Sequence, residues 1–141
     1  MSDKQPEKPN LDLIQMVQQA RMMHDADAKP SQVAGVYWIE AKSNTPETKP
    51  PTPFSGQWEL ETSVTEVDAV WAKIKTATEA GELGYKSKVS TSSRNQRNSN
   101  ARTIAVRTYD SRDDADKKRI RTVLENLGIT GDWRYVADSE S

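Results

Sequence analysis

The chain has 141 residues, which is the size of one ordinary domain. Hydrophobic residues make up 34% and charged residues 29%, so we expect one core with unfolded tails. With no Cys and one His, the composition excludes disulfides, Cys-ligated zinc, iron–sulfur clusters, thiol catalysis and multi-His metal sites. No run approaches the roughly 20 apolar residues of a membrane span, and no signal-peptide pattern follows the charged start. We therefore expect a cytoplasmic protein with no membrane partner.

Polar segments separate the expected elements. Residues 1–9 and 139–141 have the composition of disordered tails. Residues 43–53 hold four of the seven prolines and predict an exposed extended loop inside a single α+β domain at 32–138. Residues 10–24 predict a helix that could pack on the domain, bind a protein partner or form only transiently. Its apolar stripe is Leu13, Met16, Val17, Ala20 and Met23.

The first half of the domain predicts two strands and a helix. Residues 36–42 (VYWIEAK) are rich in β-branched and aromatic residues, and residues 57–62 (QWELET) alternate between apolar and polar. The sequence SVTE at 63–66 has the spacing of a capping box, so we expect the helix to begin there. Gly81 and Gly84 mark its exit. The helical stripe consists of Val67, Val70, Trp71, Ile74 and Ala77.

The next segment predicts a β-hairpin. Residues 85–91 and 102–109 are expected to be antiparallel strands, joined by a mobile cationic loop at 92–100. If Tyr85, Ser87 and Val89 face the helices, the lysines between them face the open side of the sheet. Ile104 and Val106 give the same alternation on the second strand, and would leave Arg107 and Tyr109 on the open side with Trp38.

A second helix is expected after Asp110 or Ser111, either of which can cap it. Its stripe ends before Gly128, the expected left-handed cap, and residues 132–136 (DWRYV) predict a last strand. Two helices with one apolar stripe each, and about five strands with one apolar face each, describe a two-layer α+β sandwich. We expect a mainly antiparallel sheet with both helices on one face and the other face open.

The order of these phrases resembles a known family: SGQWELE, VDAVWAKIKTATEAGELG, KSKVST, TIAVRTYDSRDDADKKRIRTVLENLGI and WRYVAD. Over residues 36–138 the chain is similar to the messenger-RNA cap-binding initiation factors. It is more similar to the basophilic-leukaemia-expressed-protein family, also labelled phosphothreonine lyase domain proteins. The resemblance implies a cap-binding-like fold. It also implies that hairpin cations, here Arg94, Arg97 and Arg102, could hold phosphates.

The charge distribution points to the same hairpin. Residues 83–109 contain six basic residues and no acidic one, while the other 14 basic residues share the rest of the chain with all 21 acidic ones. We therefore predict a non-catalytic module for a phosphate-bearing ligand, favouring a nucleotide or single-stranded RNA stacked on an aromatic ring. It would use no cofactor or metal. The candidate ligand-binding residues are Trp38, Lys86, Lys88, Arg94, Arg97, Arg102, Arg107 and Tyr109.

Other interpretations of these residues remain open. The hairpin charges could be a solvated sheet face, the domain could be a protein-interaction module, or Lys86 or Lys88 could act as the base of a lyase or phosphoester-type enzyme. His24 has no motif around it. Trp58 and Trp71 are expected in the core, and Trp133 fits either core or edge. An acidic cluster is expected to cap the second helix rather than bind a metal, and consists of Asp110, Asp113, Asp114 and Asp116.

Overall fold

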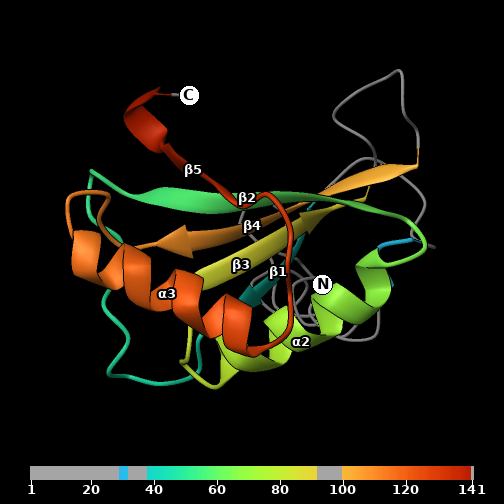
Figure 1. Cartoon of the computed structure of the whole chain (residues 1–141). Helices are drawn as coiled ribbons and strands as arrows, with labels where there is room; N and C mark the ends of the chain where they lie inside the picture. The colour runs from blue at the N-terminus through green and yellow to red at the C-terminus, as the bar shows by residue number, and fades with distance from the viewer. Residues whose placement is uncertain (1–28, 32–37, 92–99, 141) are drawn as a thin grey trace, which may run out of the picture.

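The computed structural model describes residues 29–31, 38–91 and 100–140. The helix predicted at residues 10–24 lies outside these ranges, and so does His24. Figure 1 shows the described part as one sheet with helices packed against one of its faces.

Within the described residues, five strands form the sheet, and every neighbouring pair is antiparallel. Their spatial order is β1-β3-β4-β2-β5, so β3 and β4 form the predicted hairpin in the interior of the sheet. The strands are β1 (Trp38–Lys42), β2 (Gly56–Ser63), β3 (Lys86–Ser90), β4 (Ala101–Thr108) and β5 (Arg134–Ala137). The antiparallel α+β prediction is confirmed.

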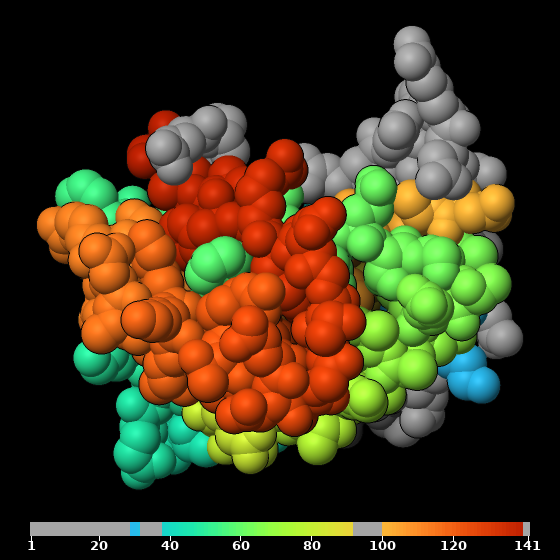
Figure 2. Space-filling view, in the orientation of Figure 1, coloured from blue at the N-terminus to red at the C-terminus, as the bar shows by residue number. Residues whose placement is uncertain are grey.

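In the part of the chain that the structure describes, two helices cover the same face of the sheet, α2 (Val67–Glu79) and α3 (Asp114–Asn126). In the space-filling view, α3 and the connection from α3 to β5 fill the front of the molecule, with α2 beside them (Figure 2). The two-layer arrangement is confirmed, because each helix has one apolar stripe to bury and the sheet offers one apolar face. No helix among the described residues is long and apolar enough to cross a bilayer.

The core lies between the helices and the sheet. Trp71 is buried as predicted, and Trp58 packs on the core while its indole N–H donates to the Lys117 carbonyl at 3.1 Å. Trp133 belongs to the core cluster and donates to the Ile129 carbonyl at 3.3 Å. The fully buried core side chains include Ile39, Val67, Ile74, Val89, Ile104, Val106, Ile120 and Leu124.

The predicted capping box of α2 is wrong. Ser63 remains in β2, where it pairs with Ala101, and its hydroxyl contacts the Thr65 hydroxyl at 2.8 Å. The helix begins at Val67, and its N-cap Glu66 makes no side-chain capping bond. Pairing with β4 extends β2 to Ser63, and the helix begins three residues later than the box requires, so Ser63 does not occupy the N-cap position.

The cap predicted for α3 is also displaced. Asp113 is the N-cap, and its carboxylate accepts from the backbone N–H of Asp116 at 3.0 Å. Asp110 accepts instead from the Arg112 N–H at 2.8 Å and holds the turn before the helix, while the Ser111 N–H donates to the Phe54 carbonyl. Gly128 has φ +79° and ends the helix as predicted, because a residue without a Cβ adopts this conformation freely.

Candidate functional site

The sheet face opposite the helices carries a cluster of polar and aromatic side chains. Directly paired residues of an antiparallel ladder point to the same side, and Glu40 pairs with Lys88 while Gln57 pairs with Arg107. Their neighbours Ile39 and Val89 are fully buried against the helices. We call the opposite set the open-face cluster, and it consists of Trp38, Glu40, Gln57, Tyr85, Lys86, Lys88, Arg107 and Asp138.

Lys88 lies against an aromatic ring without an acidic partner. Its Nζ is 4.5 Å from the centroid of the Trp38 ring, and it forms no ion pair or hydrogen bond with any residue in the described ranges. Burial lowers the pKa of Lys88, and the positive charges of Arg107 and Lys86 lower it further. The carboxylates of Glu40 and Asp138 raise the pKa of Lys88 and only partly offset this lowering.

Lys86 has a partner, but a weak one. Its Nζ lies 3.3 Å from Glu40 Oε2, with side-chain exposures of 26% and 40%. Water screens pairs this exposed, and they typically contribute about 0.2–1 kcal/mol. Lys86 can therefore exchange Glu40 for a ligand anion at little cost.

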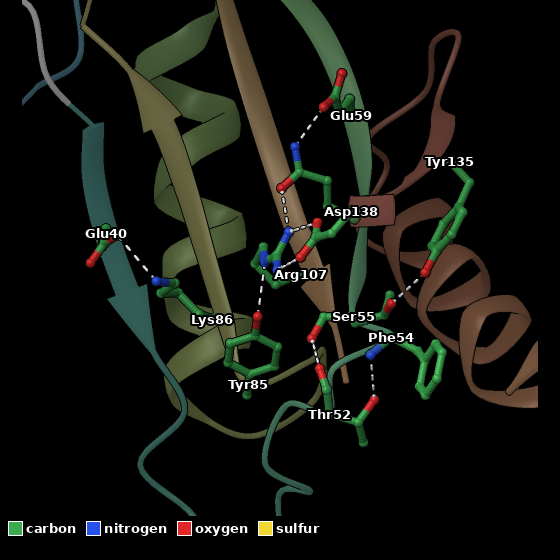
Figure 3. A network of polar contacts seen from close by, with 12 residues as sticks. Glu40, Thr52, Phe54, Ser55, Glu59, Tyr85, Lys86, Arg107, Tyr135 and Asp138 are labelled. Atoms are coloured by element: carbon green, nitrogen blue, oxygen red, sulfur yellow. Dashed lines mark hydrogen bonds and ion pairs between the residues drawn. The ribbon is translucent and has the colours of Figure 1, made fainter. Parts of the chain in front are cut away.

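Arg107 is held by three different side chains (Figure 3). Its two terminal nitrogens donate to both carboxylate oxygens of Asp138 at 2.7 and 2.6 Å, and one of them also donates to Gln57 Oε1 at 3.0 Å. Its Nε donates to the Tyr85 hydroxyl at 2.8 Å. The Asp138 hydrogen bond raises the pKa of Arg107, and the same contact lowers the pKa of Asp138. The guanidinium is thus fixed in orientation.

The prediction for Tyr85 is wrong. Tyr85 was expected to face the helices with Ser87, but its hydroxyl accepts from Arg107 in the open-face cluster. The reason is that β3 begins one residue later, at Lys86, so strand alternation does not extend back to Tyr85. Ser87 does face the helices, where its hydroxyl contacts that of Thr78 at 2.7 Å.

Tyr109 also departs from its predicted place. It follows the end of β4, and its hydroxyl donates to Asp113 at the start of α3. Lys49 Nζ lies 4.8 Å from its ring centroid. The hydrogen bond with Asp113 raises the pKa of Tyr109 and lowers that of Asp113. Tyr109 is therefore not part of the open-face cluster.

A cavity of about 430 Å³ lies at this end of the sheet. Lys49, Tyr85 and Tyr109 contribute to its lining, and Tyr85 thereby links the cavity to the open-face cluster. Arg119 lines it as well, but its guanidinium is bonded to the carbonyls of Glu82 and Leu83 at 2.9 and 3.0 Å.

The remaining predicted arginines do not join the cluster. Arg102 alternates in phase with Ile104, so it points to the face opposite that of Arg107, and its Nη1 donates to the Ala101 carbonyl at 2.9 Å. Arg94 and Arg97 lie outside the described residues. The residues from the predicted site that the structure brings together are Trp38, Lys86, Lys88 and Arg107.

Comparisons with known proteins agree with this architecture. Residues 52–136, more than half of the chain, match the family described as Basophilic leukemia-expressed protein Bles03. The chain belongs to this family. No curated protein matches its sequence.

The Bles03-family chain also resembles solved structures of a translation initiation factor. Ascaris suum eIF4E-3 in complex with m7G cap is 18% identical, with a TM-score of 0.56 over 89% of this chain and 75% of that one. The same factor with m2,2,7G cap is 17% identical, with a TM-score of 0.56 over 84% of this chain and 72% of that one. These likenesses confirm the predicted cap-binding-like fold.

Four members of the open-face cluster of this Bles03-family chain were not among the predicted site residues, namely Glu40, Gln57, Tyr85 and Asp138, and neither was the exposed Phe54 near α3. Gln57 was detectable, because it alternates with the inward-facing Trp58. Asp138 had no local signal, since its partner is 31 residues away in the sequence. Phe54 lies just past the predicted proline-rich loop and is 46% exposed, with the Arg112 guanidinium carbon 3.9 Å from its ring centroid.

The acidic residues near α3 have structural roles. Asp113 caps the helix, and Arg112 holds the pKa of the Asp110 carboxyl well below its usual range. Lys117 contacts Asp114, and Arg119 contacts Asp116. Within the described ranges, no three His, Asp or Glu side chains are grouped so that they could hold a metal ion.

Proposed function

We propose that this chain is a non-catalytic binding module for a phosphate-bearing ligand, namely a nucleotide or single-stranded RNA, and that the open-face cluster binds it. The observation that carries the proposal is the position of Lys88. Its ammonium group lies beside the Trp38 ring and has no anionic partner among the described residues. An incoming phosphate would supply the missing negative charge.

The charges of the open-face cluster support this assignment. Its three cations are opposed by two carboxylates, those of Glu40 and Asp138, which leaves one positive charge in excess. The nearby Glu59 is already bonded to Arg134 at 3.3 Å. A phosphodiester, with one negative charge, would balance this excess, and a phosphate monoester, with a charge of about −1.5 to −2, would more than balance it.

The aromatic ring supports a ligand with a planar base. Stacking of a base on an aromatic side chain contributes roughly 1–3 kcal/mol and tolerates every base. A base stacked on the face of the Trp38 ring that Lys88 does not cover would bring its phosphate within reach of Lys88, whose Nζ lies 4.5 Å from the ring centroid. The solved structures of similar fold contain a bound cap, which also supports a ligand with a base and phosphates. Binding would then be weakly sequence-specific and sensitive to salt.

Fluorescence polarisation with labelled mononucleotides and short single-stranded RNA, at two salt concentrations, tests the proposal. Lys88→Ala and Trp38→Leu should each weaken binding about tenfold, because each removes one of the two contacts. Lys75→Ala is the matched control, since it removes the same charge from α2, where Lys75 pairs with Glu79. Absence of binding at micromolar protein, or equal losses in Lys75→Ala and Lys88→Ala, would contradict the assignment.

A lysine base is a second candidate, and the lowered pKa of Lys88 is the observation that favours it. A base needs an unprotonated amine near neutral pH, and burial beside Arg107 shifts Lys88 in that direction. Incubation with a phosphothreonine peptide separates the two functions. A binding module leaves the peptide intact, whereas release of inorganic phosphate that is lost in Lys88→Ala would establish an enzyme.

A further inference from the structure

Arg107 has the geometry of a prepared anion site. Two neutral groups hold its guanidinium: the Tyr85 hydroxyl accepts from Nε, and Gln57 Oε1 accepts from Nη1. The side chain is only 13% exposed, so its orientation is fixed by its surroundings. A fork of parallel N–H donors suits a carboxylate and a phosphate equally well.

The anion now on this fork comes from the chain itself. Asp138 begins the short 3-10 turn η1 (Asp138–Glu140) directly after β5, and both of its carboxylate oxygens accept from Arg107. Its side chain is 47% exposed, in contrast to that of Arg107. Its backbone N–H donates to the Ser55 carbonyl at 3.0 Å, which positions the turn at the edge of the open face. The Arg107 guanidinium is therefore largely buried, and the more exposed Asp138 carboxylate covers it on the solvent side.

We propose that the Asp138 carboxylate occupies the phosphate position of the open-face cluster and must leave Arg107 when a phosphate-bearing ligand binds. This inference rests on the proposed function and adds to it the regulation of the same site. Turn η1 acts as an internal competitor. The ligand that displaces it has to present a terminal or bridging phosphate to Arg107.

The charges explain why a phosphate can win this competition. Asp138 brings one negative charge, which Arg107 neutralises, while Lys88 remains without a bonded anion in the described part of the chain. Lys88 pairs with Ala105, two residues from Arg107 on the same face of β4, so the two cations are diagonal neighbours in the β3–β4 ladder. A terminal phosphate monoester, with a charge of about −1.5 to −2, can neutralise both cations at once, and so can two successive phosphodiesters of a single strand with one charge each.

Binding to variants of the full chain tests the competition, with single-stranded RNA and inorganic phosphate as probes. Asp138→Asn keeps the shape of the side chain and removes the charge, and it should bind the RNA roughly fivefold more tightly than the natural chain. Asp132→Asn is the matched control, because Asp132 is an exposed acid outside the cluster and loses the same charge. It should bind as the natural chain does.

A second measurement follows Arg107 directly. The ¹H–¹⁵N side-chain resonance of its Nε should shift on titration with inorganic phosphate, and at lower phosphate concentration in Asp138→Asn. The double variant Arg107→Lys/Asp138→Asn should lose the gain in RNA affinity, because an ammonium group lacks the bidentate fork.

The possible outcomes separate the two proposals. If the natural chain binds RNA through Lys88 and Asp138→Asn binds no more tightly than Asp132→Asn, the competition is overturned and the proposed function stands. If neither the natural chain nor Asp138→Asn binds RNA or phosphate, both proposals fall. Binding that is detected only after the Asp138→Asn change would establish the competition in its strongest form.

Discussion

The two faces of this sheet are built from the same strands but are organised by different physics. On the helix-covered face, Ile104 and its neighbours are fully buried. Apolar residues of similar volume can replace one another at such positions at a small cost in stability. On the open face, Arg107 depends on particular partners at particular distances. The comparison teaches that burial of apolar side chains organises one face, whereas directional hydrogen bonds organise the other.

The largest difference between the faces should appear in the core. Ile104→Ala removes a fully buried side chain from the centre of β4 and leaves a cavity, which should lower the free energy of unfolding by about 2–5 kcal/mol. Urea denaturation followed by tryptophan fluorescence measures the change. A loss below about 1 kcal/mol would mean that the core collapses around the gap, and the contrast between the faces would fail.

The next largest effect is expected for Arg107 and its hydrogen bonds on the open face. Arg107→Gln leaves Asp138 and Tyr85 without their donor and should cost about 1–3 kcal/mol in the same denaturation experiment. Arg134→Gln is the control, because Arg134 is 77% exposed and pairs with Glu59 at 3.3 Å. Equal losses in the two variants would show that the Arg107 contacts contribute no more than a surface ion pair.

Acid should weaken the contact between Asp138 and Arg107 on the open face. The contact with Arg107 lowers the pKa of Asp138 below its unfolded value of about 3.9. The stabilisation from this carboxyl is therefore present above pH 4 and is lost as the pH falls through the lower folded pKa. Chemical denaturation at a series of pH values should show a shallower acid decline in Asp138→Asn. Parallel pH profiles for the natural chain and the variant would contradict this.

The smallest effect is expected for the exposed ion pair of Lys86 and Glu40. Lys86→Ala should change the free energy of unfolding by about 0.5 kcal/mol or less, because water and salt screen its contact with Glu40. The same variant should weaken RNA binding more at low salt than at high salt. A stability loss comparable to that of Arg107→Gln would show that the Lys86 pair is stronger than its exposure indicates.

The periodicity of the sequence was enough to predict the layers. Val89 in β3 and Ile104 in β4 were assigned to the helix-facing side by alternation alone, and both are fully buried. Gly128 was assigned to the end of the second helix and has the expected positive φ. These features follow from interactions between near neighbours in the chain, and such interactions are visible in a local pattern.

The errors lie at the ends of elements. Ser63 and Asp110 were both expected near helix caps, but a sheet ladder holds the first and an ion pair with Arg112 holds the second. Tyr85 and Tyr109 flank the hairpin strands by one residue each, so the alternation that places their neighbours does not apply to them. The ends of helices and strands depend on tertiary contacts that compete with local capping, and a periodic pattern does not contain that information.

The sequence by itself determined the two-layer architecture, the face on which Lys86, Lys88 and Arg107 lie, and the excess of positive charge in the hairpin. Only the tertiary structure decided which of these cations has an anion. Arg107 meets Asp138 because β5 and turn η1 return alongside β2, whereas Lys88 meets Trp38 across the β1–β3 pair. Alternation fixes the side to which a residue points, but its partner depends on segments brought together by folding.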